Sequence, residues 1–205
     1  MKIKLCGLTR PLDIKCANAL NPDYVGFVFA KESKRYISPE TAKSFKDILL
    51  PKIQAVGVFV NEEVKTIADL LNSNIIDIAQ LHGNEDETYI KKLRVLTDKP
   101  IIKAFKIKTR EDLSVVRTSS ADYVLIDSGS GSGNVFDWDL VKTFDRPYFL
   151  AGGLNPQNVE EAIRTLKPYA IDVSSGIETD GLKDVRKMTD FVRTARSVSE
   201  RIGKY

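Results

Sequence analysis

Eight short apolar segments alternate with helical segments from one end of this chain to the other, and this alternation restricts the fold more than any other feature. The apolar segments are rich in Val, Ile and Phe, which is typical of buried strands. Strands that alternate with helices favour a parallel sheet. The predicted strands span residues 3–6, 24–29, 53–60, 75–81, 100–105, 122–127, 147–152 and 169–174.

The length available to each strand–helix unit selects among the parallel-sheet folds. Dividing 205 residues by eight gives about 26 residues per unit, enough for a strand, a helix and two short loops. We therefore predict an α/β fold, a (β/α)8 TIM barrel that forms a single domain over residues 1–205, at the small end of that fold's range. The alternative is an open doubly wound sheet, which more often has five or six strands. No linker, low-complexity segment or block of charge indicates a second domain.

Several helix starts are predicted from their first residues. Asn61 and Asn84 precede acidic residues and are predicted N-caps. Ser38 and Asn155 each precede a proline, which is favoured at the first helical position. Trp138 is expected to lie at the start of the sixth helix and to pack against the core rather than against a ligand.

Composition and charge exclude several classes of protein. The net charge of +3 is small and dispersed, so no nucleic-acid partner is expected, although an anionic small ligand remains compatible with it. The sequence contains no apolar run of about 18 residues, so no membrane span is predicted. No signal peptide precedes the first strand, and we therefore expect a cytoplasmic protein. Cys6 and Cys16 are expected to be free thiols, Cys16 within the core. With His82 as the one histidine, no metal site is predicted.

The barrel prediction directs attention to the carboxyl ends of the strands, where such barrels carry their sites. Cys6 ends the first predicted strand and Asp127 ends the sixth. Because side chains alternate along a strand, Ile3 and Leu5 should face the helices, which turns Lys4 and Cys6 inward. The same alternation turns Asp127 inward, and a thiol opposite a carboxyl group can act as base and acid. The alternative is structural, since buried free cysteines are common and a strand-end aspartate can cap a helix.

Glycine- and serine-rich loops follow each of the last three predicted strands. Glycines allow backbone N–H groups to approach an anion closely, and phosphate in these barrels frequently binds after strands seven and eight. The alternative is three tight turns that bind nothing. The candidate phosphate-binding residues are Gly131, Ser132, Gly133, Gly152, Gly153, Ser174, Ser175 and Gly176.

Two further residues are candidates for ligand contact. Arg35 lies in the loop after the second strand, on the side of the mouth expected to be far from the phosphate, and its guanidinium suits two-pronged binding of a carboxylate. The alternative is an arginine exposed to solvent. His82 ends the fourth strand, where it would either line the site or brace its loop.

Seven segments together resemble one known family. "KLCGLTR", "GFVFAKESKRYISPE", "VGVFVNE", "QLHG", "FDW", "GGLNP" and "DVSSGIE" occur in this order and at matching spacing. On these motifs the chain resembles the phosphoribosylanthranilate isomerases, from about residue 3 to about residue 192.

The resemblance implies an enzyme of tryptophan biosynthesis that uses no cofactor. It would convert one small-molecule phosphosugar–anthranilate substrate, N-(5-phosphoribosyl)anthranilate, into 1-(2-carboxyphenylamino)-1-deoxyribulose 5-phosphate. By the same resemblance Cys6 is the general base, Asp127 the general acid and Arg35 the ligand of the anthranilate carboxylate, and the three glycine loops bind the phosphate. Whether the protein is a monomer or a homodimer stays open.

One departure from the family and two rival functions remain. Asn134 stands where the family often has a lysine, which would weaken phosphate binding if that charge were important. Lys4 is expected to pair with Asp172.

One rival function is that of the similar isomerase of histidine synthesis. Its expected aspartate base and its substrate with two phosphates do not match Cys6 and one phosphate cluster. The other is a non-catalytic phosphosugar-binding barrel protein.

Overall fold

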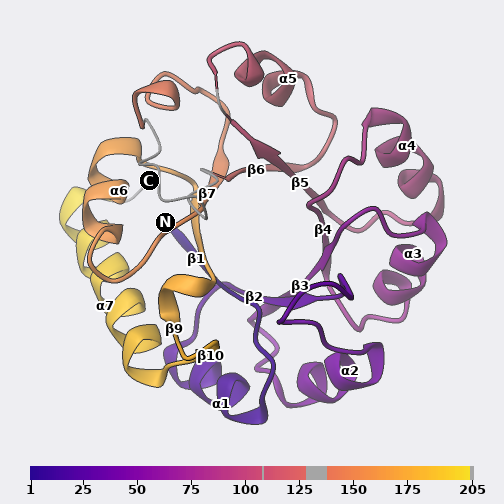
Figure 1. Ribbon diagram of the computed structural model, residues 1–205, viewed down its shortest axis with the longest axis horizontal. Coiled ribbons are helices and arrows are strands. Elements are labelled where there is room, and N and C mark those ends of the chain that lie inside the picture. The colour runs from indigo at the N-terminus through magenta and orange to yellow at the C-terminus, as the bar shows by residue number, and fades with distance from the viewer. Residues whose placement is uncertain (108, 128–137, 204–205) are drawn as a thin grey trace.

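Eight parallel strands close into a barrel, which confirms the predicted (β/α)8 fold (Figure 1). The structure is a computed structural model that describes residues 1–107, 109–127 and 138–203. Each strand pairs with its neighbours in chain order, and β1 pairs with β8 to complete the ring. The strands are β1 (Lys2–Cys6), β2 (Tyr24–Val28), β3 (Gln54–Phe59), β4 (Ile78–Leu81), β5 (Ile101–Lys106), β6 (Tyr123–Asp127), β7 (Tyr148–Ala151) and β8 (Ala170–Val173).

Helices surround the barrel on its outside (Figure 1). They are α1 (Pro11–Leu20), α2 (Pro39–Ile48), α3 (Val64–Asn72), α4 (Glu87–Leu96), α5 (Asp112–Thr118), α6 (Val159–Leu166) and α7 (Val185–Ile202).

A helix starts at Trp138 as predicted, but it is a short 3-10 helix rather than an α-helix. In the part of the chain that the structure describes, only the 3-10 helix η2 (Trp138–Leu140) lies between β6 and β7. The following residues include Thr143, Phe144 and Asp145, which have modest helix propensity, and Pro147 disfavours a helical residue before it. Trp138 packs against the core, as expected.

Of the four predicted N-caps, one is confirmed. The Ser38 side chain accepts a hydrogen bond from Thr41 N at the start of α2. Asn61 and Asn84 bond to each other instead, since Asn61 Oδ1 accepts from Asn84 N and ties the loops after β3 and β4 together. Helices α3 and α4 begin later than predicted, after the N-caps Glu63 and Asp86. Helix α6 also begins later, after the N-cap Asn158, because Asn155 Oδ1 accepts hydrogen bonds within the preceding turn, from Gln157 N and Asn158 N.

The core has an outer layer between strands and helices and an inner layer inside the barrel. Ile3 and Leu5 belong to the outer layer, whereas Cys6 packs inside against Val28 and Val58, as the alternation predicted. Aromatic rings fill the amino-terminal end of the barrel, with centroids such as those of Tyr24 and Phe149 only 5.4 Å apart. Side chains therefore fill the barrel interior at the amino-terminal ends of the strands, and the interior opens at their carboxyl ends.

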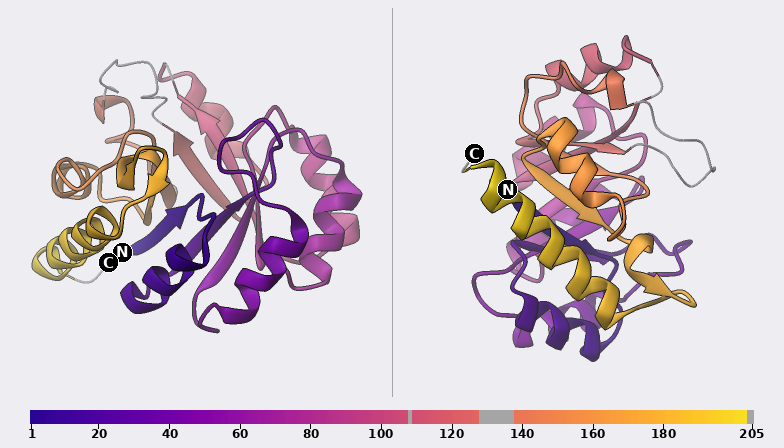
Figure 2. Two further views of the ribbon diagram at one scale, coloured as in Figure 1. Left: turned by 60° about the horizontal axis from the view of Figure 1, so that its bottom comes forward. Right: turned by 90° about the vertical axis from the view of Figure 1, so that its left-hand side faces the viewer.

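A small hairpin follows β8 at the edge of the barrel mouth. The chain passes through the 3-10 helix η3 (Ser175–Ile177) into β9 (Glu178–Thr179) and β10 (Leu182–Lys183), which pair antiparallel. The connecting Asp180 and Gly181 have φ values of 51° and 78°, in the left-handed region that a two-residue hairpin turn requires. Figures 1 and 2 show this hairpin beside the start of α1.

None of the helices in the described part of the chain is long and apolar enough to cross a membrane.

Candidate active site

A cavity of about 480 Å³ opens at the carboxyl ends of the strands. Of the residues that the sequence marked as candidates, its lining includes Cys6, Arg35, His82, Asp127, Gly152, Gly153, Ser174 and Ser175. The structure thus brings together residues from β1, the loop after β2, and the ends of β4, β6, β7 and β8. Gly176 lies next to this lining, whereas Gly131, Ser132, Gly133 and Asn134 lie outside the described residues.

The Cys6 thiol lies directly against the backbone of β2. Cys6 pairs in register with Gly26, and a Cβ atom added to Gly26 would lie 2.5 Å from Cys6 Sγ. A glycine is needed here because any side chain would displace the sulfur. Gly26 therefore fixes the position of Sγ at the cavity wall.

Burial and the charged groups nearby together shift the pKa of Cys6. Burial has the largest effect and raises the pKa of the Cys6 thiol, while the ammonium groups of Lys4 and Lys183 act in the opposite direction. Lys4 is fully buried, and its Nζ donates to Asp172 Oδ2 at 2.7 Å, so the expected Lys4–Asp172 pair is present. The Asp172 carboxylate in turn raises the pKa of Cys6.

A hydrogen-bonded chain leads from β4 to Asp127. Gln80 Nε2 lies 2.9 Å from His82 Nδ1, and His82 Nε2 lies 3.2 Å from Asp127 Oδ2. With Gln80 donating to Nδ1, the proton of a neutral His82 ring lies on Nε2 and is donated to Asp127. His82 thus both lines the cavity and contacts the carboxyl group proposed as the acid.

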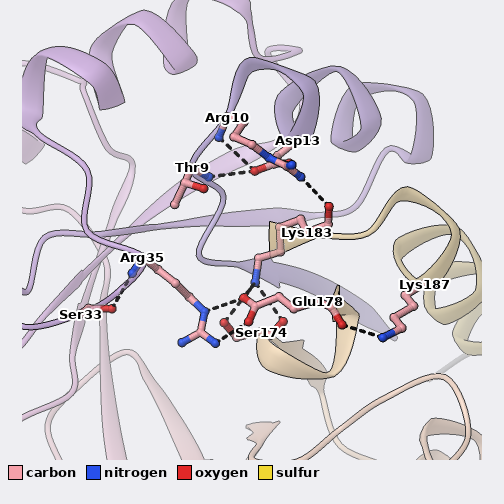
Figure 3. A network of polar contacts seen from close by, with 9 residues as sticks. All are labelled: Thr9, Arg10, Asp13, Ser33, Arg35, Ser174, Glu178, Lys183 and Lys187. Carbon is pink, nitrogen blue, oxygen red and sulfur yellow. Dashed lines mark hydrogen bonds and ion pairs between the residues drawn. The ribbon is translucent and has the colours of Figure 1, made fainter. Parts of the chain in front are cut away.

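Arg35 is held at the cavity edge by an ion pair that the sequence did not predict (Figure 3). Its Nε and Nη2 donate to the two carboxylate oxygens of Glu178, at 2.6 and 2.7 Å. This pairing raises the pKa of the Arg35 guanidinium. Arg35 also lies closer to the loop after β8 than expected, because a Cβ on Gly7 would lie 2.5 Å from Arg35 Cδ and 3.2 Å from Ser174 Oγ. The hairpin after β8 reaches toward the loop after β2 and produces this proximity.

The loops after β7 and β8 pack backbone against backbone. A Cβ on Gly176 would lie 1.9 Å from the Leu154 carbonyl oxygen, so only glycine fits between the two loops. Gly153 has a φ of 61°, a conformation that favours glycine. Among the described residues, no backbone carbonyl accepts a hydrogen bond from the N–H groups of Gly153 or Ser175. Both residues line the cavity, where these donors can meet an anion.

A second hollow, of about 650 Å³, adjoins this cavity between the loops after β3, β4 and β5. The two share Val60, His82, Lys106 and Asp127 in their linings. In the described residues, no group of three or more His, Cys, Asp or Glu side chains could hold a metal ion.

Three residues at or behind the site were missed at the level of sequence: Gly26, Glu178 and Lys183. For Gly26 a signal existed, since a lone glycine inside a strand pattern indicates a close approach of another chain segment. Glu178 ends the motif "DVSSGIE", but its partner Arg35 lies 143 residues away, so the sequence did not indicate the pair. Lys183 lies on the same very short hairpin, which no periodicity marks.

This architecture, with polar side chains gathered at the carboxyl ends of eight parallel strands, defines a (β/α)8-barrel enzyme. The sequence model of the N-(5'-phosphoribosyl)anthranilate (PRA) isomerase family matches residues 3–194. The chain belongs to this family, which confirms the resemblance found in its motifs.

Individual relatives cover nearly the whole chain. It is 46% identical to the N-(5'-phosphoribosyl)anthranilate isomerase of Endomicrobium trichonymphae, over 96% of this chain and 99% of that protein. It is 44% identical to the enzyme of Acetivibrio thermocellus, over 95% of each chain. The crystal structure of phosphoribosyl anthranilate isomerase from Thermotoga maritima matches with a TM-score of 0.88 and 36% identity, covering 96% of this chain and 99% of that one.

Proposed function

We propose that this chain catalyses the reaction of its family, the rearrangement of N-(5-phosphoribosyl)anthranilate to 1-(2-carboxyphenylamino)-1-deoxyribulose 5-phosphate. One observation carries the proposal: Cys6 and Asp127, which end β1 and β6, line a single cavity together with Arg35 and the glycine loops after β7 and β8. A solved family structure, with a TM-score of 0.86 and 36% identity, is in complex with the reduced form of that product.

The two chemical steps require an acid and then a base. Asp127 donates a proton to the ring oxygen of the furanose, the C1'–O bond breaks, and the nitrogen lone pair forms an iminium with C1'. Cys6 as thiolate removes the C2' proton, which the iminium has made acidic, and the electron pair of the C–H bond neutralises the nitrogen. The resulting enolamine tautomerises to the ketose. No electrons leave or enter the substrate, so no redox cofactor is needed.

Both ends of the substrate carry negative charge, and each end is bound by a different kind of hydrogen-bond donor. The anthranilate carboxylate binds the guanidinium of Arg35, a pairing that is strong because both partners are charged. The phosphate binds the backbone N–H groups of the loops after β7 and β8, among them those of Gly153 and Ser175. Gly131, Ser132 and Gly133, the other candidates for phosphate binding, lie outside the described residues. If these N–H groups provide most of the binding, Asn134 in place of a lysine costs little affinity.

The cavity floor suits a sugar between those two ends. Gln80 Oε1 and Asp172 Oδ1 are buried and accept no hydrogen bond from any described residue. Buried acceptors without donors are unfavourable, and the hydroxyl groups of a ribose would supply such donors. His82 contributes by holding the Asp127 carboxyl group in place.

A reducing compartment suits this mechanism, because Cys6 must remain a thiol. Cys6 and Cys16 are both free and buried. The protein is thus proposed to act in the cytoplasm on a small molecule, with neither nucleic acid nor membrane as a partner. A solved relative from Thermotoga maritima is described as dimeric, so this chain is either a monomer or a homodimer.

A fluorescence assay tests the proposal. Freshly prepared phosphoribosylanthranilate should lose its anthranilate emission when the protein is added, whereas the matched variant Cys16→Ser, which alters a thiol on α1 away from the cavity, should be as active as the wild type. Product identity would be checked by comparing its chromatographic retention time with that of authentic ketose, because substrate and product have the same mass. Binding of the reduced product without any turnover by folded wild-type protein would instead indicate the non-catalytic phosphosugar-binding barrel.

A further inference from the structure

Glu178 is a buried carboxylate that the proposed reaction does not use. It begins β9 in the hairpin after β8, and its side chain is only 9% exposed. Both of its oxygens accept from Arg35, and Oε1 also accepts from Lys183 Nζ at 2.6 Å (Figure 3). Burial alone would raise the pKa of Glu178, but the hydrogen bonds from Arg35 and Lys183 outweigh it and hold the pKa below its ordinary value. Glu178 is therefore an anion in the folded protein at neutral pH.

The contact with Glu178 uses one specific edge of the guanidinium. Nε and one hydrogen of Nη2 form the side edge, and Nη1 with the second hydrogen of Nη2 forms the end edge. Glu178 occupies the side edge with two short hydrogen bonds. Among the described residues, nothing accepts a hydrogen bond from Arg35 Nη1. Arg35 lines the cavity and Glu178 does not, so Glu178 acts on a ligand through its partners, of which Arg35 is the one that presents its charge to the cavity.

Glu178 is itself held in place from the far side. Lys183 Nζ donates to Glu178 Oε1 and to the Ser174 carbonyl oxygen at 2.9 Å, and Lys187 Nζ donates to the Glu178 carbonyl oxygen at 2.6 Å. Lys183 is 4% exposed, so this anchor is shielded from water. The Arg35 stem is fixed as well, because it lies across the bare Cα of Gly7. The guanidinium consequently has little freedom to turn.

Charge balance at this cluster favours an anionic ligand. Two cations, Arg35 and Lys183, share the single carboxylate of Glu178. One net positive charge is left over from these three groups, and Arg35 presents it at the cavity surface. If Glu178 were the partner of Arg35 alone, the pair would be neutral and would attract a carboxylate less strongly. Without Glu178, the long side chain of Arg35 could adopt many rotamers.

We propose that Glu178 is a positioning residue that orients Arg35, so that the end edge of the guanidinium faces the substrate carboxylate. The inference rests on the proposed function, in which Arg35 binds that carboxylate. Glu178 does not touch the substrate, and Lys183 acts behind it as the anchor that fixes its carboxylate.

Binding measurements on matched variants test this role. The probes are the reduced 1-(o-carboxyphenylamino)-1-deoxyribulose 5-phosphate and its phenylamino analogue, which lacks the carboxyl group. Glu178→Gln should weaken the carboxylate-bearing probe by roughly tenfold, the effect of one disturbed charge-assisted hydrogen bond, and should leave the analogue within about twofold. KM for substrate should rise by a similar factor, and kcat should change much less.

A double-mutant cycle separates action through Arg35 from a general structural effect. In the Arg35→Met background, Glu178→Gln should change binding of the carboxylate-bearing probe by no more than about twofold, because its route of action is gone. The control is Glu160→Gln, which removes a Glu–Arg pair of α6 that is almost half exposed and lies away from the cavity. Equal weakening of both probes by Glu178→Gln, or full additivity with Arg35→Met, would overturn the proposal.

A second measurement uses the wild-type protein and does not depend on a variant folding. The Nε–H resonance of Arg35 should report a hydrogen bond in the free protein and should persist when the carboxylate-bearing probe binds, while the Nη signals shift. Loss of the Nε–H signature on binding would mean that Arg35 leaves Glu178, and the positioning role would be refuted. Turnover of substrate by the wild type is measured separately, so an inactive but well-positioned site would refute the proposed function alone.

Discussion

Replacing Gly26 with alanine should damage the chemical step while leaving most of the protein intact. The added Cβ would lie 2.5 Å from Cys6 Sγ and 3.0 Å from Cys6 Cα. Favourable contacts between heavy atoms of this size lie at about 3.5–4.0 Å, so the sulfur must move by roughly 1 Å. A misplacement of about 1 Å can reduce a rate about 10²-fold, and we expect a loss of that size in kcat/KM. Overpacking should also lower the free energy of unfolding by about 1–3 kcal/mol.

The matched control for this experiment is Gly57→Ala, on the neighbouring strand. A Cβ at Gly57 would lie 2.5 Å from Ile76 Cδ1 and 2.8 Å from Phe59 Cε2, so the crowding is similar. These contacts belong to the outer core layer, on the helix side of the barrel. Gly57→Ala should therefore lose stability to a similar degree but retain its turnover per folded molecule. The assay is loss of anthranilate fluorescence, with thermal unfolding measured in parallel.

Two results would refute this reasoning. If Gly26→Ala is folded and keeps more than half of the wild-type kcat/KM, the position of Cys6 Sγ does not limit the reaction. If Gly57→Ala loses as much turnover as Gly26→Ala, general overpacking rather than the displaced thiol explains the loss.

The other predictions address the base, its titration and the frame of the site. Cys6→Ala should reduce kcat by about 10²–10⁴-fold and still bind the reduced product, and retention of more than half of kcat would reduce Cys6 to a packing residue. Because burial raises the pKa of Cys6, kcat/KM should still be rising with pH at the ordinary thiol value, and a limb at or below that value would contradict the prediction. Glu85→Ala should lower the free energy of unfolding by about 3–5 kcal/mol in urea titrations, because it leaves the buried ammonium of Lys103 without its carboxylate. Burial alone would raise the pKa of Glu85, but hydrogen bonds from Lys103 and from backbone N–H groups outweigh it and lower that pKa. The contribution of Glu85 to the free energy of unfolding is therefore complete above the unfolded pKa of 4.5 and is lost as the pH falls toward the lower folded pKa. Urea midpoints that do not change below pH 4.5 would argue against this contribution.

The fold was predictable because its signals are local and repeated. Each apolar run marks one strand, and eight runs in 205 residues leave room for little other than a barrel. The inward direction of Cys6 followed from the same alternation. Helix starts were less predictable, since Asn61 and Asn84 are good caps by themselves but satisfy each other across two loops. Whether a polar side chain caps its own helix or bridges to another segment depends on tertiary contacts, which residue type does not reveal.

The surroundings of the site were less predictable than its principal residues. Cys6, Asp127 and Arg35 stand out because of their places at the ends of predicted strands. The partner of Arg35 lies 143 residues away, on a hairpin whose strands have only two residues each. No periodicity marks such a hairpin, and its position beside the loop after β2 arises only when the barrel closes and brings β8 next to β1. Pairings of this kind are a property of the closed ring rather than of any segment.

The charges gathered around Cys6 favour the direction of proton transfer that the mechanism needs. The cluster consists of the cations Lys4, Lys183 and Arg35 and the anions Asp172 and Glu178. With a neutral Cys6 thiol its net charge is one positive charge, and thiolate formation brings the net charge to zero. Binding of the substrate carboxylate at Arg35 adds a negative charge, so the thiolate becomes less favourable once substrate is bound and its affinity for a proton increases. Taking the proton from C2' relieves that excess of negative charge and leaves a neutral thiol in a buried position. Binding at the carboxylate end and basicity at the sulfur are thereby linked through one set of fixed charges: Lys4, Lys183 and Arg35 as cations, Asp172 and Glu178 as anions.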